Sequence, residues 1–300
     1  MADLDKLKPG TSLIGFLEPL AAPEAAQNLA GRNLTAFSME LIPRITRAQS
    51  MDALSSMANI AGYKAVLMAA DTSTKMFPMM MTAAGTVTPA RVFVLGAGVA
   101  GLQAIATAKR LGAVVEAYDV RPEVKEQVES LGGRFVELDL KAEAEGQGGY
   151  AAAQSEEFYR RQREQLAKRM STADVVITTA LVPGRKAPVL ITKEMANHLA
   201  PGAVIIDLAA EKGGNCALTE PGQTVDYRGI QVIGAVNLPS EVAFHASQMY
   251  SKNVSTFVAH LVKDGKLSLN LEDEIVKGTL VAHEGRVVHE AVRKALGQGG

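Results

Sequence analysis

Three glycines between residues 96 and 101 restrict the possible folds of this chain more than any other feature of its sequence. The run Gly96-Ala-Gly-Val-Ala-Gly101 follows an apolar stretch, Arg91–Leu95, and opens a helical pattern that continues to Leu111. In such a GxGxxG turn, the first glycine permits a tight turn, the second lets backbone approach a pyrophosphate, and the third lets the helix pack on the strand. The N–H groups at the helix start then bind the phosphates. The pattern predicts a dinucleotide site formed by Gly96, Ala97, Gly98, Val99, Ala100 and Gly101.

Apolar strands alternate with helical segments through this region of the chain. The predicted strands are Arg91–Leu95, Val114–Tyr118, Arg134–Leu138, Asp174–Thr179, Ala203–Leu208 and Ile230–Gly234. Because parallel strands need crossover connections, the alternation predicts an α/β fold of the Rossmann type, with a doubly wound parallel sheet.

The beginning and the end of the chain do not follow this alternation. We predict strands at Ser12–Phe16 and Leu34–Ser38, helices at Pro23–Ala30, Arg47–Ala70 and Ala243–Val262, and a hairpin at Thr279–Val288 that turns at Glu284-Gly285. Residues 1–48 and 244–300 are expected to form an outer α/β domain, and residues 49–243 the nucleotide-binding domain. The methionine run at 76–81 (Met76, Met79, Met80 and Met81) is expected to fill gaps in the packing.

Asp119 stands at the end of the second predicted strand of the sheet, where a carboxylate can accept hydrogen bonds from adenosine ribose hydroxyls. It would repel a 2′-phosphate, so the sequence predicts a preference for NAD(H) over NADP(H). Arg121 is the opposing signal, because an arginine can bind that phosphate. The carboxylate is the stronger signal, since its charge must be overcome before the arginine helps. Asp119, Val120 and Arg121 are all expected to line the cofactor site.

The fourth and fifth predicted strands end in segments rich in small residues, 178–184 and 207–215. Ligands of doubly wound sheets bind at the carboxyl ends of the strands. Small side chains there let a cofactor lie against the backbone. We favour this interpretation over the alternative that these residues only form loops. The residues predicted to contribute are Thr179, Ala180, Asp207, Gly213, Gly214 and Asn215.

A long polar insertion, residues 139–165, separates the third and fourth predicted strands. Gly146, Gly148 and Gly149 give its tip many backbone conformations, and Tyr150 follows directly. This composition suits a lid that closes over a bound nucleotide, with a disordered surface loop as the alternative.

Composition and charge argue against several classes of function. Lys and Arg number 31 and Asp and Glu 32, so no basic excess is present to neutralise a nucleic-acid backbone. The single cysteine, Cys216, cannot form an internal disulfide, and no cysteine and histidine cluster indicates a metal site. No run of about 18 apolar residues occurs, so the chain is expected to be cytoplasmic and not to span a membrane itself.

General acid–base residues are missing from the predicted strand ends. A dehydrogenase that acts on a hydroxy or amino acid needs such a group, usually histidine or lysine. The histidines fall on other segments and are expected to be structural or at the surface; they are His198, His245, His260, His283 and His289.

Several longer segments resemble the NAD(H)-binding domain of proton-translocating transhydrogenase, in the alanine dehydrogenase/transhydrogenase family. They are Glu40–Asp52, Arg91–Ala104, Tyr118–Pro122, Thr178–Gly184 and Ile206–Cys216. The resemblance implies that this chain holds NAD(H) beside a separate NADP(H)-binding component, and that hydride passes directly between the two nicotinamides. A membrane component would couple that transfer to proton movement. Such a transfer moves no proton at the site, which agrees with the missing acid–base group.

The same resemblance implies roles for residues outside the glycine turn. Arg44, Gln49 and Asp52 correspond to a family loop near the nicotinamide, and Ser55 to its neighbour on the following helix. Tyr150 corresponds to the tyrosine of a mobile loop that closes over the nucleotide. The family further implies a homodimer, with NADP(H)-binding and membrane-spanning partners that hold the chain at the inner face of the plasma membrane.

Two alternatives stay open. Alanine dehydrogenase has a similar architecture, but that family's catalytic lysine and histidine lie in an N-terminal part that this chain is expected to lack. Family members begin with further strand–helix units before the position of Leu7, so the outer domain here is expected to be incomplete. The other alternative is therefore a truncated NAD(H)-binding module that no longer supports turnover.

Overall fold

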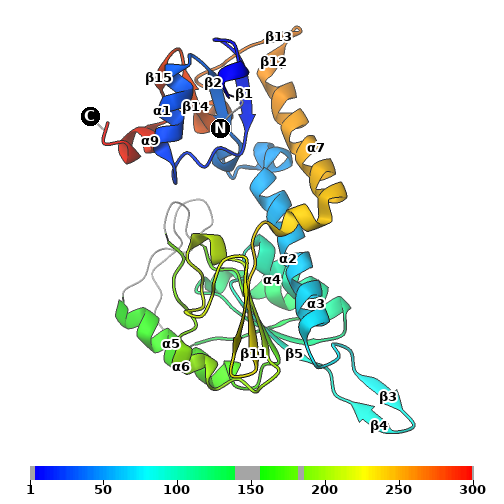
Figure 1. Ribbon diagram of the computed structural model, residues 1–300. Helices are drawn as coiled ribbons and strands as arrows, with labels where there is room; N and C mark the ends of the chain where they lie inside the picture. The colour runs from blue at the N-terminus through cyan, green and yellow to red at the C-terminus, as the bar shows by residue number, and fades with distance from the viewer. Residues whose placement is uncertain (1–3, 139–155, 182–185, 299–300) are drawn as a thin grey trace. The chain divides into compact units, whose positions relative to one another are not determined.

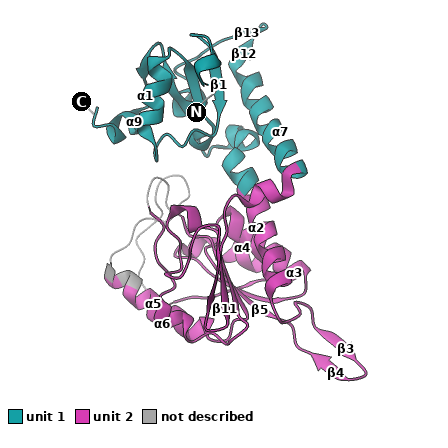
Figure 2. Ribbon diagram, in the orientation of Figure 1, with its two compact units in different colours: residues 1–57, 244–300 teal, residues 58–243 magenta. Residues whose placement is uncertain are grey.

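A computed structural model describes residues 4–138, 156–181 and 186–298. The chain divides into two compact units (Figures 1 and 2). Unit 1 combines residues 1–57 with residues 244–300, and unit 2 comprises residues 58–243. Each unit is built around its own sheet.

The sheet of unit 2 confirms the predicted Rossmann-type fold. Its order among the described residues is β10-β11-β9-β8-β5-β6-β7, and all neighbouring strands are parallel except β10 and β11. The strands are β5 (Arg91–Leu95), β6 (Val114–Tyr118), β7 (Arg134–Phe135), β8 (Val175–Thr178), β9 (Val204–Asp207), β10 (Thr224–Tyr227) and β11 (Ile230–Gly234).

Two details of this sheet differ from the sequence prediction. The antiparallel edge strand β10 was not predicted, because its residues are partly exposed and polar and so lack the apolar run of a central strand. The third predicted strand is shorter than expected, since β7 ends at Phe135, although Val136 still donates a hydrogen bond of 2.8 Å to Ala117.

Helices cover both faces of the sheet, as a doubly wound fold requires. They include α3 (Val99–Arg110), α4 (Lys125–Ser130), α5 (Glu156–Met170) and α6 (Lys193–Ala196). Alternate residues of β5 enter two separate cores: Val92 and Val94 pack on the side of α3, while Phe93 and Leu95 pack on the side of α5 and α6. Both cores therefore converge on the strand that precedes the glycine turn.

Unit 1 contains a smaller sheet that joins the two ends of the chain. Its order is β1 (Ser12–Gly15), β2 (Thr35–Ser38), β14 (Leu280–His283) and β15 (Arg286–Val287). The hairpin predicted in the tail is confirmed: β14 and β15 are antiparallel, and Gly285 adopts a positive φ of 75° at the turn. The helices of this unit include α1 (Pro23–Gly31), α7 (Ala243–Leu261), α8 (Glu274–Thr279) and α9 (Glu290–Ala295), and a short ribbon pairs β12 (Val262–Lys263) with β13 (Lys266–Leu267).

The long helix predicted from Arg47 begins later than expected. Residues Thr46–Met51 form a 3₁₀-helix, and α2 (Ala53–Thr72) follows it. Asp52 separates the two because its backbone is not helical and its carboxylate accepts hydrogen bonds from the first turn of α2. No helix among the described residues combines the length and the apolar character that a membrane span needs.

The methionine run does not fill gaps in a core, so that prediction is wrong. Residues Met80–Thr82 and Gly85–Val87 form an antiparallel hairpin, β3–β4, whose strands are exposed (Figure 1). Met79 is 59% exposed and Met81 79% exposed. Gly85, the first residue of β4, has a φ of 125° beside the turn at residues 83–84 that joins the two strands.

Candidate functional site

The glycine turn between β5 and α3 has the geometry that the sequence predicted. Gly96 has a φ of 101°, a conformation that side chains rarely allow. A Cβ built on Gly101 would lie 1.9 Å from the carbonyl oxygen of Gly96, so only glycine permits this approach of helix to strand. A Cβ on Gly98 would meet nothing within 4 Å. Gly98 thus faces open space, while the other two glycines hold the turn closed.

The N-terminus of α3 supplies hydrogen-bond donors beside that open space. Gly98 is the N-cap residue, and no side chain caps the helix there in the described part of the chain. Leu102 donates to the carbonyl of Gly98 at 2.8 Å, whereas the N–H groups of Val99 and Ala100 precede the first intrahelical bond. Uncapped N–H groups and the positive end of the helix dipole favour an anion such as a pyrophosphate.

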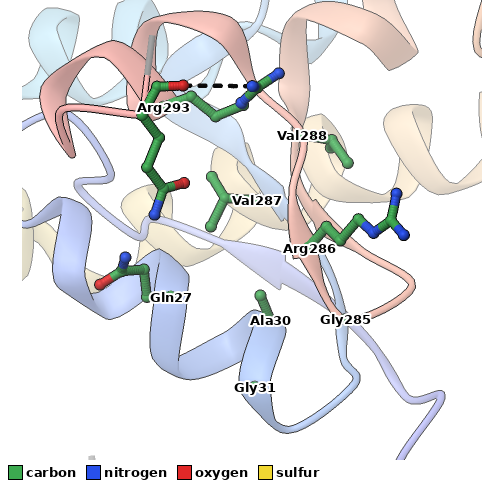
Figure 3. A pocket seen from close by; sticks show the side chains of 9 residues that line it. Gln27, Ala30, Gly31, Gly285, Arg286, Val287, Val288 and Arg293 are labelled. Carbon is green, nitrogen blue, oxygen red and sulfur yellow. Dashed lines mark hydrogen bonds between the residues drawn. The ribbon is translucent and has the colours of Figure 1, made fainter. Parts of the chain in front are cut away.

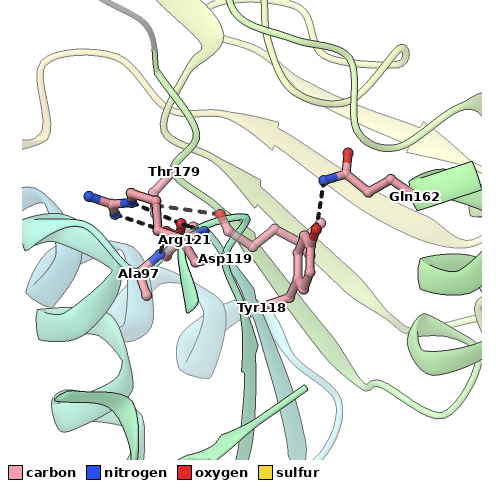
Figure 4. Close-up of polar contacts among 8 residues, drawn as sticks. Ala97, Tyr118, Asp119, Arg121, Gln162 and Thr179 are labelled. Atoms are coloured by element: carbon pink, nitrogen blue, oxygen red, sulfur yellow. Dashed lines mark hydrogen bonds and ion pairs between the residues drawn. The ribbon is translucent and has the colours of Figure 1, made fainter. Parts of the chain in front are cut away.

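Asp119 lies at the end of β6, directly beside the glycine turn (Figure 4). Its Oδ2 accepts a hydrogen bond of 2.7 Å from the backbone N–H of Ala97. Arg121 donates to the same carboxylate from its backbone N–H at 2.9 Å and from its Nε at 3.0 Å, both to Oδ1, and from Nη2 to Oδ2 at 3.0 Å. The two side chains are only 7% and 13% exposed. The structure therefore brings the two competing signals of the sequence together as one ion pair.

Thr179 and Ala180 follow β8 and face the same turn. The hydroxyl of Thr179 donates to the carbonyl of Gly96 at 3.1 Å. A Cβ on Gly96 would come within 2.5 Å of that hydroxyl, so the two residues can be neighbours only because position 96 is glycine. Val120 is half-buried and packs against the core that also contains Tyr118. These residues border the turn through backbone and small side chains.

Asp207 is completely buried at the end of β9, and its carboxylate is used within the protein. Oδ1 accepts from Thr178 Oγ1 and from the N–H of Ala209, both at 2.9 Å. Oδ2 accepts from the N–H groups of Asn215 (2.7 Å) and Cys216 (3.0 Å), and from Thr219 Oγ1 (2.6 Å). The side chain thus shapes the loop after β9 and has no open position for a ligand.

The side chain of Asn215 connects this loop to the segment that follows β8. Its side-chain oxygen accepts from the N–H of Ala180 at 3.0 Å, and its nitrogen donates to the carbonyls of Ala180 at 2.9 Å and Pro188 at 2.8 Å. Gly213 and Gly214 make the turn at φ values of 97° and 77°. A Cβ on Gly214 would lie 2.9 Å from Asp207 Oδ2, so this glycine is required for the carboxylate network.

The predicted nicotinamide residues lie in unit 1. Asp52 caps α2, accepting hydrogen bonds from the backbone N–H of Ser55 at 2.9 Å and from its hydroxyl at 2.6 Å. The structure therefore brings Asp52 and Ser55 together, and both are half-buried. Arg44 and Gln49 are exposed on the segment before the helix. Tyr150 and residues 182–184 lie outside the described residues.

A buried polar pair next to Asp119 is not among the residues predicted from the sequence. The amide nitrogen of Gln162, on α5, donates to the hydroxyl of Tyr118 at 3.0 Å (Figure 4). Burial raises the pKa of Tyr118 to about 12. The available signal was spacing: Gln162 precedes Leu166 and Met170 at steps of four, which places it on the buried stripe of an otherwise charged helix.

Three histidines and the single cysteine have structural partners in the described part of the chain. His283 Nδ1 lies 3.0 Å from Thr35 Oγ1, and His260 lies 3.4 Å from Asp273. Burial lowers the pKa of His289 and raises the pKa of Cys216 to about 11, so both are held neutral. These residues are structural in this fold.

A pocket of about 680 Å³ occurs in unit 1, between α1, the β14–β15 turn and α9 (Figure 3). Arg286 and Arg293 line it, and Arg293 Nη2 donates to the carbonyl of Gln298 at 3.3 Å. None of the predicted site residues lines this pocket. The volume of this pocket alone therefore does not identify a nucleotide site.

The family models and the most similar sequences assign this chain to the same family. Residues 65–290 match the domain described as alanine dehydrogenase/PNT, C-terminal domain, and residues 1–61 match the alanine dehydrogenase/PNT, N-terminal domain. The chain is 54% identical over 297 residues to an NAD(P) transhydrogenase subunit alpha protein of Rhodospirillum rubrum, a match that covers 98% of this chain and 77% of that protein. The corresponding protein of Rickettsia prowazekii is 45% identical over 293 residues, covering 98% and 76%.

Solved structures agree with the sequence comparison. The crystal structure of transhydrogenase from Sinorhizobium meliloti is similar with a TM-score of 0.84 and 48% identity, covering 95% of this chain and 77% of that chain. An L-alanine dehydrogenase structure is similar with a TM-score of 0.79 and 26% identity, covering 99% and 78%. The chain therefore belongs to the alanine dehydrogenase/PNT family and is similar within it to the alpha subunits of NAD(P) transhydrogenases.

Proposed function

We propose that this chain is the NAD(H)-binding component of a proton-translocating transhydrogenase. Hydride would pass directly between NAD(H) held here and NADP(H) held by a partner component. The observation that carries the proposal is the glycine turn at the uncapped N-terminus of α3, with the Asp119 carboxylate beside it. The transhydrogenase relatives, at 54% and 45% identity, support the same assignment.

The residues at the turn fit the adenosine and pyrophosphate parts of NAD(H). Backbone at Gly98 is open to a phosphate, and the N–H groups of Val99 and Ala100 can donate to it. The Asp119 carboxylate suits ribose hydroxyls and disfavours a 2′-phosphate. Thr179 and Ala180 border the turn, while Asp207, Gly213, Gly214 and Asn215 act by holding the neighbouring loops in place.

The segment before α2 is proposed to orient the nicotinamide end. Bound nicotinamide supplies the hydride donor or acceptor, so the protein has only to orient it and exclude water. Arg44 and Gln49 present polar, exposed side chains for orientation. Asp52 and Ser55 fix the start of α2 and hence the end of that segment. The assignment of Tyr150 to the same function stays a prediction.

The proposed enzyme also contains two partner components. An NADP(H)-binding component and a membrane-spanning component are expected to complete the enzyme and to hold it at the inner face of the plasma membrane. We further propose that the chain forms a homodimer. The exposed methionines of the β3–β4 hairpin support self-association, because Met81 is 79% exposed and flexible thioether side chains adapt well to a partner surface.

Reconstitution tests the proposed function directly. The purified chain is mixed with an NADP(H)-binding transhydrogenase component, and reduction of an NAD analogue by NADPH is followed by absorbance. We expect turnover only when both proteins are present. The control is Gly101→Ala, in which the turn should be disrupted. NADH binding without any turnover would favour a non-catalytic binding module, and failure to bind NADH would refute the proposal.

An alanine dehydrogenase-like activity is the second candidate, supported by the similarity to L-alanine dehydrogenase at a TM-score of 0.79. Oxidation of an amino acid needs a general base near the nicotinamide. His283, His260 and His289 instead lie against Thr35, Asp273 and the backbone of Gly278, which weighs against a general-base role for these three. Incubation with L-alanine and NAD⁺ distinguishes the two candidates, because formation of NADH without any NADP(H) component would favour the dehydrogenase.

A further inference from the structure

The carboxylate of Asp119 already accepts hydrogen bonds at all of its main acceptor positions. Oδ1 accepts from the backbone N–H and the Nε of Arg121, at 2.9 and 3.0 Å. Oδ2 accepts from the N–H of Ala97 at 2.7 Å and from Nη2 of Arg121 at 3.0 Å. Two carboxylate oxygens offer about four lone-pair positions in total. Donors of the protein itself therefore occupy the acceptor positions that the ribose hydroxyls would need (Figure 4).

Two of these bonds can be released and two are fixed by the fold. The N–H of Ala97 belongs to the glycine turn, and the N–H of Arg121 belongs to the chain that leaves β6. Main-chain donors of this kind move only if the turn moves. The Nε and Nη2 bonds come from a side chain that can rotate away from the carboxylate. Only the guanidinium can make room for ribose hydroxyls without rebuilding the turn.

We propose that the Arg121 guanidinium covers the ribose-binding face of Asp119 in the absence of nucleotide, and that NAD(H) binds by displacing it. This inference rests on the proposed function and adds to it a residue that sets affinity and cofactor choice. The ribose hydroxyls donate to the carboxylate in place of Nε and Nη2, so the number of donors at Asp119 is preserved in the complex.

The exchange lowers the affinity for NAD(H). Asp119 and Arg121 are 7% and 13% exposed, and a charge-assisted pair with so little solvent contact is stronger than one at the surface. Without the guanidinium, the carboxylate of the empty protein is left under-satisfied, whereas in the complex the ribose satisfies it. A substitution that destabilises only the empty state must tighten binding.

The displaced guanidinium also affects the choice between cofactors. A 2′-phosphate has no proton to donate to Asp119, and its charge is repelled by the carboxylate. Arg121, once released, remains within reach of that position and offsets part of the repulsion. Removal of Arg121 should therefore tighten binding of NADH by more than it tightens binding of NADPH. A shift in the relative affinity for two ligands that differ only in one phosphate is the signature of the proposed exchange.

Titration of the full chain and of Arg121→Ala with NADH, NADPH and reduced nicotinamide mononucleotide tests this inference. We expect NADH to bind the variant about threefold to tenfold more tightly, by the range expected for one or two released hydrogen bonds. The ratio of the NADPH to the NADH dissociation constant should rise. The mononucleotide lacks the adenosine ribose, so its affinity should not change. Arg134→Ala, which removes an exposed arginine paired with Glu116 on the same sheet, should leave all three affinities unchanged.

Thermal unfolding provides a second readout, with Arg121→Gln as a variant that disturbs folding less. Both variants should melt lower than the unmodified chain when empty and approach it at saturating NADH. Weaker or unchanged binding of NADH by both variants would overturn the inference, because Arg121 would then stay on Asp119 in the complex. If the unmodified chain and the variants all fail to bind NADH, the proposed function fails and the inference fails with it.

Discussion

The hydroxyl of Tyr118 accepts a hydrogen bond of 3.0 Å from the side-chain amide of Gln162, and this contact joins β6 to α5. Tyr118 is 6% exposed and Gln162 1% exposed. The Oε1 atom of Gln162 has no hydrogen-bond partner among the described residues. The otherwise charged helix is therefore held, through one buried polar contact, against the strand that ends at Asp119.

Tyr118→Phe should destabilise the fold by about 1–3 kcal/mol, because it leaves the buried amide of Gln162 without its acceptor. The double variant Tyr118→Phe with Gln162→Leu should recover most of this loss, since both polar partners are then replaced by apolar groups. Urea unfolding of the single and double variants measures the coupling. Additive losses would show that the contact contributes nothing to stability.

Burial of the Tyr118 phenol predicts a pH dependence at the alkaline end. Burial raises the pKa of Tyr118 to about 12, above the ordinary value of 10.0, so the folded state holds the phenol proton more tightly than the unfolded state. The resulting stability is complete below about pH 10 and is lost as the pH rises toward about 12. Unfolding free energies at about pH 9 and about pH 11 should differ less for Tyr118→Phe than for the unmodified chain. An equal slope for the two proteins would contradict this.

Asp207→Asn should lower the free energy of unfolding by about 2–4 kcal/mol, because an amide nitrogen would face donors that now point at a carboxylate oxygen. The loop that ends in Asn215 should loosen at the same time, since Asn215 and Cys216 both donate to Oδ2. Urea unfolding measures the loss. The matched control, Asp71→Asn, removes the same charge from an exposed position and should change stability little.

Two glycine variants should separate folding from nucleotide binding. Gly101→Ala places a Cβ 1.9 Å from the Gly96 carbonyl, so we expect a loss of about 1–3 kcal/mol in stability together with a loss of NADH binding. Gly98→Ala meets no protein atom within 4 Å and should fold normally, yet its methyl group would occupy space meant for the pyrophosphate. Thermal melts with and without NADH distinguish the two. Normal NADH binding by Gly98→Ala would place the pyrophosphate elsewhere.

Gln49→Ala should slow hydride transfer by more than it weakens NADH binding. The side chain is exposed on the segment before α2, where the proposed function places the nicotinamide contacts. Single-turnover kinetics with the NADP(H) component, combined with NADH titration, separate the two effects. Gln27→Ala, at an exposed position on α1, serves as the control. A lower melting temperature with an unchanged rate per folded molecule would show that the segment is only structural.

Met81→Ser should weaken self-association without reducing monomer stability, because the side chain is 79% exposed on the β3–β4 hairpin. Burial of a methionine side chain stabilises by about 1.5–3 kcal/mol, so the dimer dissociation constant should rise about tenfold or more. Sedimentation equilibrium measures the change. Leu271→Ser, which replaces another exposed apolar residue at 51% exposure, should leave the dissociation constant unchanged. A monomeric unmodified chain would refute the proposed dimer.

The elements that could be predicted from the sequence are those encoded by short-range patterns. The glycine turn, the strands β5, β6, β8, β9 and β11, and the tail hairpin all follow from spacings within a few residues, because strand and helix periods repeat locally. The edge strand of the sheet and the ends of the helices could not be predicted in the same way. The strand β10 has no apolar run, and α2 begins at Ala53 because the cap at Asp52 outweighs a helical pattern that continues before it.

The sequence by itself thus determined that Asp119 and Arg121 would lie together at a strand end beside a glycine turn. Only the tertiary structure decided what their side chains do. Asp119 bonds to Ala97, 22 positions away, and Tyr118 bonds to Gln162, 44 positions away. Partners so distant in sequence are chosen by the packing that removes them from water, since a buried polar group must find a donor or acceptor inside the protein. No local pattern contains that choice.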